Sequence, residues 1–156
     1  MRGAVGATAL LLAAGLAPPA ATAGGPGALY DTHCAICHQR AGVGATGQFP
    51  RLAGRVAAIA ADARGRAYLV GVVRNGLAGA INVDGTVVAG LMPPLPQLEA
   101  HELASILNYL TSLPPAPKHK PQRFDAAEVA RLSKEARSPQ QLLAQREALL
   151  SAGVIP

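Results

Sequence analysis

Cys34-Ala35-Ile36-Cys37-His38 is the stretch of sequence that decides the fold. Two cysteines separated by two residues and followed at once by a histidine form the attachment pattern of haem c. Each thiol can add across one vinyl group of the porphyrin, and the two-residue spacing lets both thiols reach one edge of the same macrocycle. The histidine then lies directly below the iron. The motif predicts one covalently bound haem c, attached through Cys34 and Cys37, with His38 as an axial iron ligand.

Other uses of paired cysteines explain this motif less well. A disulfide would suit an exported chain, and a redox-active pair has the same spacing. Neither of them explains the histidine that follows at once. A zinc site would need two more ligands at suitable spacing, and the chain has no other cysteine. Haem attachment is therefore the favoured interpretation.

Met92 is the candidate for the second axial iron ligand. Apart from Met1 it is the only methionine of the chain, and it lies in Gly90-Leu91-Met92-Pro93-Pro94. A methionine often only fills a gap in a core, and bis-histidine ligation through His33, His101 or His119 is a further alternative. A lone methionine in a proline-rich loop favours ligation. Because a His/Met pair leaves no open position for oxygen or peroxide, we expect no catalytic residues.

The first 23 of the 156 residues differ from the rest of the chain. Arg2 precedes an apolar run from Ala4 to Ala17, two prolines follow, and Ala21-Thr22-Ala23 offers small residues to signal peptidase. The run is shorter than the ~20 residues of a membrane span. We therefore predict a cleaved signal peptide over residues 1–23, a periplasmic location and no transmembrane anchor in the mature chain.

The composition narrows the class of partner. The chain has no Trp, two Phe and three Tyr, so a large buried cofactor would supply core that the side chains do not. The formal net charge is +5, and a basic balance can indicate nucleic acid, an anionic surface or an acidic protein. Export and the lack of an arginine-dense or aromatic face argue against nucleic acid. We expect redox partner proteins with an acidic docking surface.

Residues 24–115 are predicted to form one compact domain. The glycine-rich segment 42–47 indicates a loop. Asp84-Gly85 is a favoured tight turn, and it predicts a small β-hairpin over residues 81–88, just before the loop that holds Met92. Apolar residues recur at helical spacing in three other segments. We predict helices over residues 27–37, 66–75 and 98–113, the second of them capped by Gly76.

Residues 116–156 are predicted to form an extension of this domain. A proline- and lysine-containing connector runs to about Arg123, and two short helices follow, begun by Asp125 and by Ser138-Pro139. The second helix carries a leucine stripe made of Leu142, Leu143, Leu149 and Leu150. We favour packing of this stripe on the chain's own domain. The alternative is a docking arm for a redox enzyme, such as its large subunit.

Four segments in this order resemble the class I monohaem cytochromes c of bacteria. The resemblance covers about residues 27–113 and implies an all-α fold around one covalently bound haem, with the first and last helices crossing. It also implies that the Pro50 carbonyl accepts a hydrogen bond from the ring of His38 and fixes that ligand's orientation. The segments are Leu29-Tyr30, Cys34 to His38, Phe49-Pro50-Arg51-Leu52-Ala53-Gly54 and Met92-Pro93. The crossing would bring Gly27, Ala28 and Tyr30 against Leu107 and Tyr109.

The resemblance implies a periplasmic one-electron carrier that is not an enzyme. The hairpin before the Met loop is similar to a subgroup seen as subunits or domains of periplasmic dehydrogenases and reductases. A dedicated cytochrome subunit of an alcohol, aldehyde, sulfite or similar dehydrogenase complex is therefore an alternative. A haem enzyme or gas sensor with an open iron site is a further one, and it predicts high-spin ferric haem that binds carbon monoxide.

Overall fold

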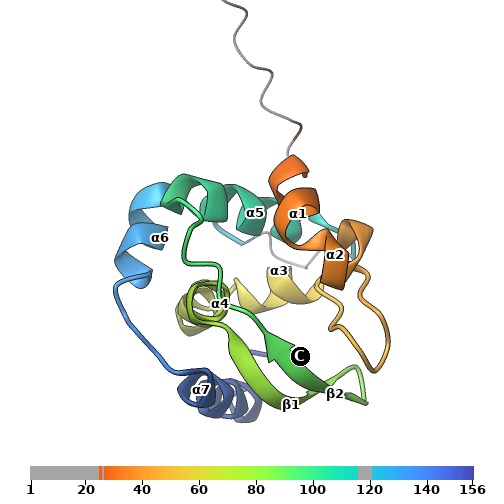
Figure 1. Ribbon diagram of the computed structural model, residues 1–156. Coiled ribbons are helices and arrows are strands. Elements are labelled where there is room, and N and C mark those ends of the chain that lie inside the picture. The colour runs from red at the N-terminus through yellow and green to blue at the C-terminus, as the bar shows by residue number, and fades with distance from the viewer. Residues whose placement is uncertain (1–24, 26, 116–120) are drawn as a thin grey trace, which may run out of the picture.

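The computed structural model describes residues 25, 27–115 and 121–156. The predicted signal peptide and most of the predicted connector, including His119, lie outside the described residues. About half of the described residues are helical, and the two strands among them form one antiparallel sheet (Figure 1). No helix within these ranges is long and apolar enough to cross a membrane.

The haem-attachment motif begins a new helix. The predicted single helix over residues 27–37 is wrong, because the chain forms α1 (Ala28–His33) and α2 (Ala35–His38) with Cys34 between them at φ −124° and ψ −34°. The Cys34 N–H still donates to Tyr30 O at 2.8 Å, while Cys34 O accepts from His38 N at 2.9 Å. Cys34 therefore ends one helix and starts the next. The 3₁₀ helix η1 (Arg40–Gly42) follows at once.

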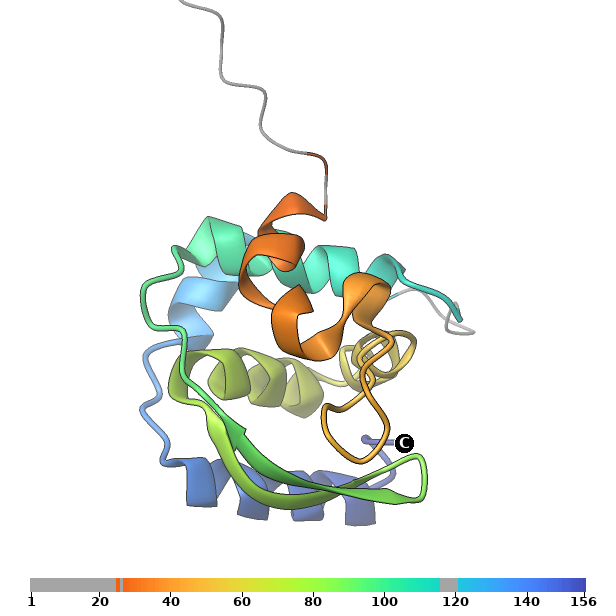
Figure 2. The same cartoon turned by 45° about the vertical axis from the view of Figure 1, so that its right-hand side comes forward.

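The first helix crosses the helix α5 (Ala100–Ser112), as Figures 1 and 2 show. The rings of Tyr30 and Tyr109 meet at a centroid distance of 5.2 Å. A Cβ at Gly27 would lie 3.0 Å from Cε2 of Tyr109, so the two helices approach closely at this point. The helix α5 begins with a capping box between Glu99 and Glu102. The crossing implied by the resemblance is present.

Two helices lie beneath this crossing. The short helix α3 (Arg55–Ile59) was not predicted, and α4 (Ala63–Asn75) begins three residues before the predicted start. Asp62 caps α4 by accepting a hydrogen bond from the Arg64 N–H at 2.7 Å, and Gly76 ends it at φ +78° as expected. Figure 2 shows α4 between this crossing and the hairpin.

The hairpin is longer than the sequence predicts. β1 (Leu77–Val83) and β2 (Thr86–Met92) pair antiparallel from Val83 opposite Thr86 to Leu77 opposite Met92. Met92 is therefore the last residue of a strand and does not lie in a loop after the hairpin. The half of the hairpin away from its turn is rich in alanine and glycine, which have little strand preference. Packing explains this pairing, because Leu143 of the extension lies against Gly79.

The extension forms α6 (Ala126–Leu132) and α7 (Pro139–Ser151), capped by Asp125 and Ser138 as predicted. The first packs on α5 and α4, and the second packs on α4 and on β1 (Figures 1 and 2). Leu142 and Leu149 are buried in the same apolar core as Tyr30 and Leu107. The leucine stripe therefore packs on the chain's own domain.

Candidate haem-binding site

Cys34 is the N-cap of α2 and Cys37 lies within that helix, and both are free thiols that are partly exposed. Burial raises the pKa of the Cys34 thiol to about 11, and the nearby Cys37 adds to that rise. Redox-active CxxC pairs have a thiol whose pKa is lowered well below its ordinary value. The raised pKa of Cys34 is therefore unlike that of a dithiol redox pair.

His38 is nearly buried, with 7% of its surface exposed. Its Nδ1 lies 2.9 Å from the carbonyl oxygen of Pro50. A carbonyl oxygen can only accept, so Nδ1 carries the hydrogen and the lone pair of Nε2 is left for a metal. Burial lowers the pKa of His38 below its ordinary value, against the smaller effect of the Pro50 carbonyl. The ring is therefore neutral near pH 7, which is the form that binds iron.

A tight loop holds Pro50 beside this ring. The Gly44 N–H donates to His38 O at 2.9 Å, and Ala45 pairs with Phe49 in an isolated bridge. Gly44 has φ +71°, and a Cβ on it would lie 2.6 Å from Phe49 O. The glycine thus lets the loop close on itself. The glycine-rich segment, predicted as a loop, therefore holds Pro50 in place beside the ring of His38.

Met92 lies at the end of β2, partly buried. The backbone of Met92 packs closely against Gly76. A Cβ at Gly76 would lie 2.7 Å from Met92 O and 3.1 Å from Pro94 N. Leu95 N donates to Val73 O at 2.8 Å, which ties the following segment to the end of α4. The segment that carries the candidate ligand is therefore fixed on both sides.

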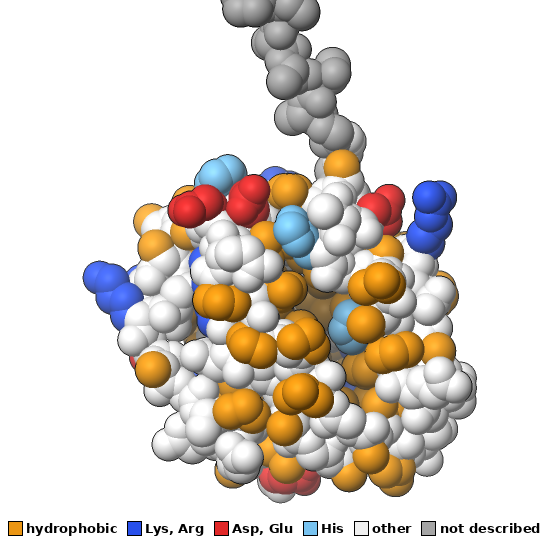
Figure 3. All heavy atoms as spheres, in the orientation of Figure 1, with side chains coloured by type: hydrophobic (Ala, Val, Ile, Leu, Met, Phe, Trp, Pro, Cys, Tyr) orange, Lys and Arg blue, Asp and Glu red, His pale blue; other side chains and the backbone are white. Residues whose placement is uncertain are grey.

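Figure 3 shows the face of the molecule on which α2 and β2 lie. Hydrophobic side chains gather around a hollow on this face, and a histidine side chain lies at its edge. Large exposed apolar side chains are sequence neighbours of three site residues, and we call these three the apolar rim: Ile36 lies between the cysteines, Phe49 precedes Pro50 and Leu91 precedes Met92. Exposed apolar side chains of this size indicate a surface that a cofactor or a partner covers. The sequence analysis did not identify this apolar rim.

The other described histidines are placed differently. His101 is exposed in the first turn of α5, and His33 is partly buried at the end of α1. Across residues 25, 27–115 and 121–156, no three side chains among His, Cys, Asp and Glu gather closely enough to hold a metal ion. A structural zinc site needs four ligands, so the described residues give the zinc alternative no support.

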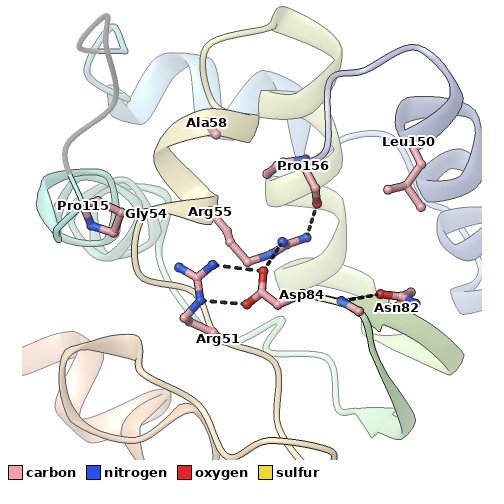
Figure 4. A pocket seen from close by; sticks show the side chains of 10 residues that line it. Arg51, Gly54, Arg55, Ala58, Asn82, Asp84, Pro115, Leu150 and Pro156 are labelled. Carbon is pink, nitrogen blue, oxygen red and sulfur yellow. Dashed lines mark hydrogen bonds and ion pairs between the residues drawn. The ribbon is translucent and has the colours of Figure 1, made fainter.

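A charged cluster that the sequence analysis missed lies near the site (Figure 4). The Asp84 carboxylate accepts from Arg51 Nε at 2.8 Å and from Arg55 Nη1 at 2.9 Å. Arg55 also donates to Pro156 O at 2.6 Å. The hydrogen bond from Arg51 is the main reason why the pKa of Asp84 lies below its ordinary value. The cluster lines a cavity of about 450 Å³ and joins the segment after Pro50 to the hairpin turn.

Comparison with known proteins finds a matching family and two similar relatives. Residues 21–110 match the family described as "Cytochrome C oxidase, cbb3-type, subunit III". A protein called cytochrome c-552 from one strain of Thermus thermophilus is 43% identical over 143 residues, covering 90% of this chain and 94% of the relative. A second cytochrome c-552 from Thermus thermophilus is 43% identical over 125 residues, covering 79% of this chain and 95% of the relative. The first alignment covers so much of the chain that it runs into the extension.

Proposed function

The chain belongs to the class I monohaem cytochromes c, and from this premise we propose that it carries single electrons in the periplasm through one covalently attached haem c. That the protein is a haem-based electron carrier follows from the family. One observation supports the further proposal that the haem is covalently attached at this motif. The neutral ring of His38, oriented by Pro50 O at 2.9 Å, lies one residue after a free cysteine pair.

The side chains present suit the cofactor. The thiols of Cys34 and Cys37 would each add across one vinyl double bond, forming a C–S bond and leaving the hydrogen on the other vinyl carbon. His38 and Met92 would be the axial ligands. When bound, the haem supplies the one-electron change of its iron. The apolar rim would exclude water from the site, and the Pro50 carbonyl would keep His38 in one tautomer and orientation.

The choice of ligands sets the expected chemistry. A methionine opposite a histidine raises the reduction potential of the iron and fills its coordination sphere. Met92 belongs to a backbone segment that Gly76 and Val73 hold closely, which supports permanent ligation. With both axial positions filled, the protein has no site for oxygen or peroxide. This is the basis for proposing a carrier that is not an enzyme.

The apolar rim is the proposed contact surface for redox partners. Lys and Arg side chains lie mainly at the margins of the face in Figure 3, while hydrophobic side chains surround the hollow. Basic residues would then steer an acidic partner from a distance without entering the contact. On this proposal raising the salt concentration slows electron transfer moderately, whereas Ile36→Asp slows it at every salt concentration. A rate unaffected by both changes would exclude this surface.

The periplasmic location rests on the first 23 residues. Their short positive start, apolar run and small-residue site are typical of a cleaved signal peptide. Covalent attachment of haem to the two cysteines would follow export. Amino-terminal sequencing of the mature protein tests this step, and a chain that keeps residues 1–23 would contradict it.

Intact-mass measurement of the matured protein tests the proposed function. We expect the mass of the polypeptide plus one haem, retained after extraction with acid and organic solvent. Cys34→Ser should keep the haem through one thioether bond, and the double variant at Cys34 and Cys37 should lose it on extraction. A chain without haem, or with haem that the extraction removes from the unmodified protein, would contradict the proposal.

A further inference from the structure

Gln39, the residue directly after His38, has a backbone conformation that is essentially restricted to glycine. Its dihedral angles are φ +60° and ψ 165°, in a region that a side chain makes unfavourable. Ala41, two residues farther on, also has a positive φ, of +54°. Such conformations cost free energy and persist only where surrounding contacts hold them. The turn behind the proposed iron ligand is therefore strained and needs an anchor.

Tyr30 of α1 supplies a contact of this kind. Its side chain has no exposed surface, and its hydroxyl donates a hydrogen bond to Gln39 O at 2.6 Å. The same oxygen accepts from the Gly42 N–H at 3.1 Å. A buried hydroxyl is costly without a hydrogen-bond partner, so the phenol of Tyr30 and the carbonyl of Gln39 hold each other in place.

The turn held by this hydroxyl is itself bonded to the segment that follows Pro50. Gly42 O accepts from the backbone N–H groups of Leu52 and Ala53 at 2.8 and 3.0 Å. Pro50 O lies 2.9 Å from Nδ1 of His38 and orients that ring. A shift of the turn would therefore move the carbonyl that holds the histidine.

We propose that the hydroxyl of Tyr30 positions the axial histidine, because it holds the strained carbonyl of Gln39 and so keeps His38 against Pro50 O. This inference rests on the proposed function, in which His38 binds the iron. A hydrogen bond from Nδ1 to a carbonyl makes the imidazole a stronger donor to a metal, and stronger donation favours the ferric state. Tyr30 thus lowers the reduction potential through His38.

Tyr30→Phe tests this assignment, because it keeps the buried ring and removes only the hydroxyl. In the haem-loaded protein we expect the hyperfine-shifted proton NMR signals of the axial histidine to move and the midpoint potential to rise. Tyr109→Phe is the matched control. Its ring meets that of Tyr30 at a centroid distance of 5.2 Å, and its hydroxyl takes no part in the contacts above, so neither quantity should change. Unchanged signals and potential in Tyr30→Phe would overturn the proposal.

Substitutions at Gln39 test the strain itself. Gln39→Gly removes the side chain that makes this conformation costly, whereas Gln39→Ala shortens the side chain and keeps the strain. Adding Tyr30→Phe should therefore move the histidine signals less in the Gln39→Gly protein than in the Gln39→Ala protein. Equal shifts in the two proteins would contradict an anchor for a strained turn.

The same pair of substitutions covers the case in which Tyr30→Phe alone does not fold. Recovery of haem-loaded Tyr30→Phe protein by Gln39→Gly, and not by Gln39→Ala, would then support the proposal. Recovery by neither would overturn it.

The unmodified protein separates this inference from the proposed function. Absence of covalent haem, or haem without the signals of an axial histidine, would contradict both. Covalent haem with those signals, identical in the unmodified protein and in Tyr30→Phe, would overturn the role of Tyr30 alone.

Discussion

Leu142 of α7 lies so close to Gly71 of α4 that a Cβ at Gly71 would stand 2.9 Å from its Cδ2. Leu142 has no exposed surface and belongs to the same core as Tyr30 and Leu107. The extension after Pro115 is therefore part of the hydrophobic core. Its buried leucines are not available as an arm for a second protein.

Leu142→Ala is expected to lower the free energy of unfolding by about 2–5 kcal/mol, because it leaves a cavity between α7 and α4. Chemical denaturation followed by circular dichroism measures this change. Gln140→Ala, in the first turn of the same helix, serves as the control and should have little effect. Equal stability of the two variants would mean that the extension does not pack as described.

Substitutions at Arg66 and at Arg64, two residues apart on α4, should have very different effects on the free energy of unfolding. Arg66 donates to Glu128 Oε1 at 2.7 Å and to Gln122 O at 2.7 Å, and it lies 3.7 Å from the centre of the Phe124 ring. Breaking such a buried pair costs about 3–5 kcal/mol, so we expect a loss of that order for Arg66→Ala in denaturant unfolding. Among the described residues Arg64 pairs with Asp62 alone, at the surface, so Arg64→Ala should change little. Similar losses in both variants would contradict the role of Arg66 in anchoring α6.

The sequence predicts features that local chemistry determines. The caps at Asp125, Ser138 and Gly76 were predicted because a side-chain acceptor or a glycine at a helix end acts within one turn. The attachment motif and Met92 were predicted as the haem site because its chemistry needs those residue types, and they stay predictions. The break at Cys34 was missed because the apolar spacing on either side of it continues without interruption.

Features that depend on distant segments were not predicted. The hairpin extends to Met92 because α7, more than fifty residues later, packs on β1. Arg51, Arg55 and Asp84 look like ordinary surface residues in the sequence, and only the fold brings them together. The apolar rim was missed for a similar reason, since hydrophobic residues such as Ile36 and Leu91 carry no signal of exposure.

Two glycines of one loop provide a test of how His38 is held. Gly44 and Gly47 have φ near +71° and +74°, so Ala at either position strains the backbone. Only at Gly44 would the new Cβ collide with the loop, 2.6 Å from Phe49 O. Gly44→Ala should therefore lose more stability than Gly47→Ala and should also displace Pro50.

Proton NMR of the ferric protein measures the second effect through the hyperfine-shifted signals of the axial histidine. We expect these signals to move in Gly44→Ala and to stay in place in Gly47→Ala. If both variants give the unmodified spectrum, the loop does not control the orientation of His38.

Tyr30 should make the free energy of unfolding fall at alkaline pH. Burial is the main reason why the pKa of Tyr30 lies well above its ordinary value of 10.0, and its hydroxyl donates to Gln39 O at 2.6 Å. Above about pH 10 the unfolded chain loses this proton while the folded chain keeps it, so the free energy of unfolding falls as pH rises. Below that pH the contribution is fully present.

Denaturant unfolding between about pH 8 and 11 measures this slope. Tyr30→Phe should be less stable at pH 8, through the lost hydrogen bond, but should lose less stability on going to pH 11. Some slope remains, because burial also raises the pKa of Tyr68. Equal slopes in the variant and the unmodified protein would contradict the assignment.

The optical spectrum of the matured ferric protein tests the central claim most directly. Ferric haem with a methionine sulfur bound to the iron has a weak far-red absorption band. We predict this band in the unmodified protein and in Leu91→Ala, which changes the exposed neighbour of the ligand. We predict its loss, together with carbon monoxide binding by the ferrous form, in Met92→Ala. Covalent haem without the band in the unmodified protein would contradict His/Met ligation and the proposal of a non-catalytic carrier.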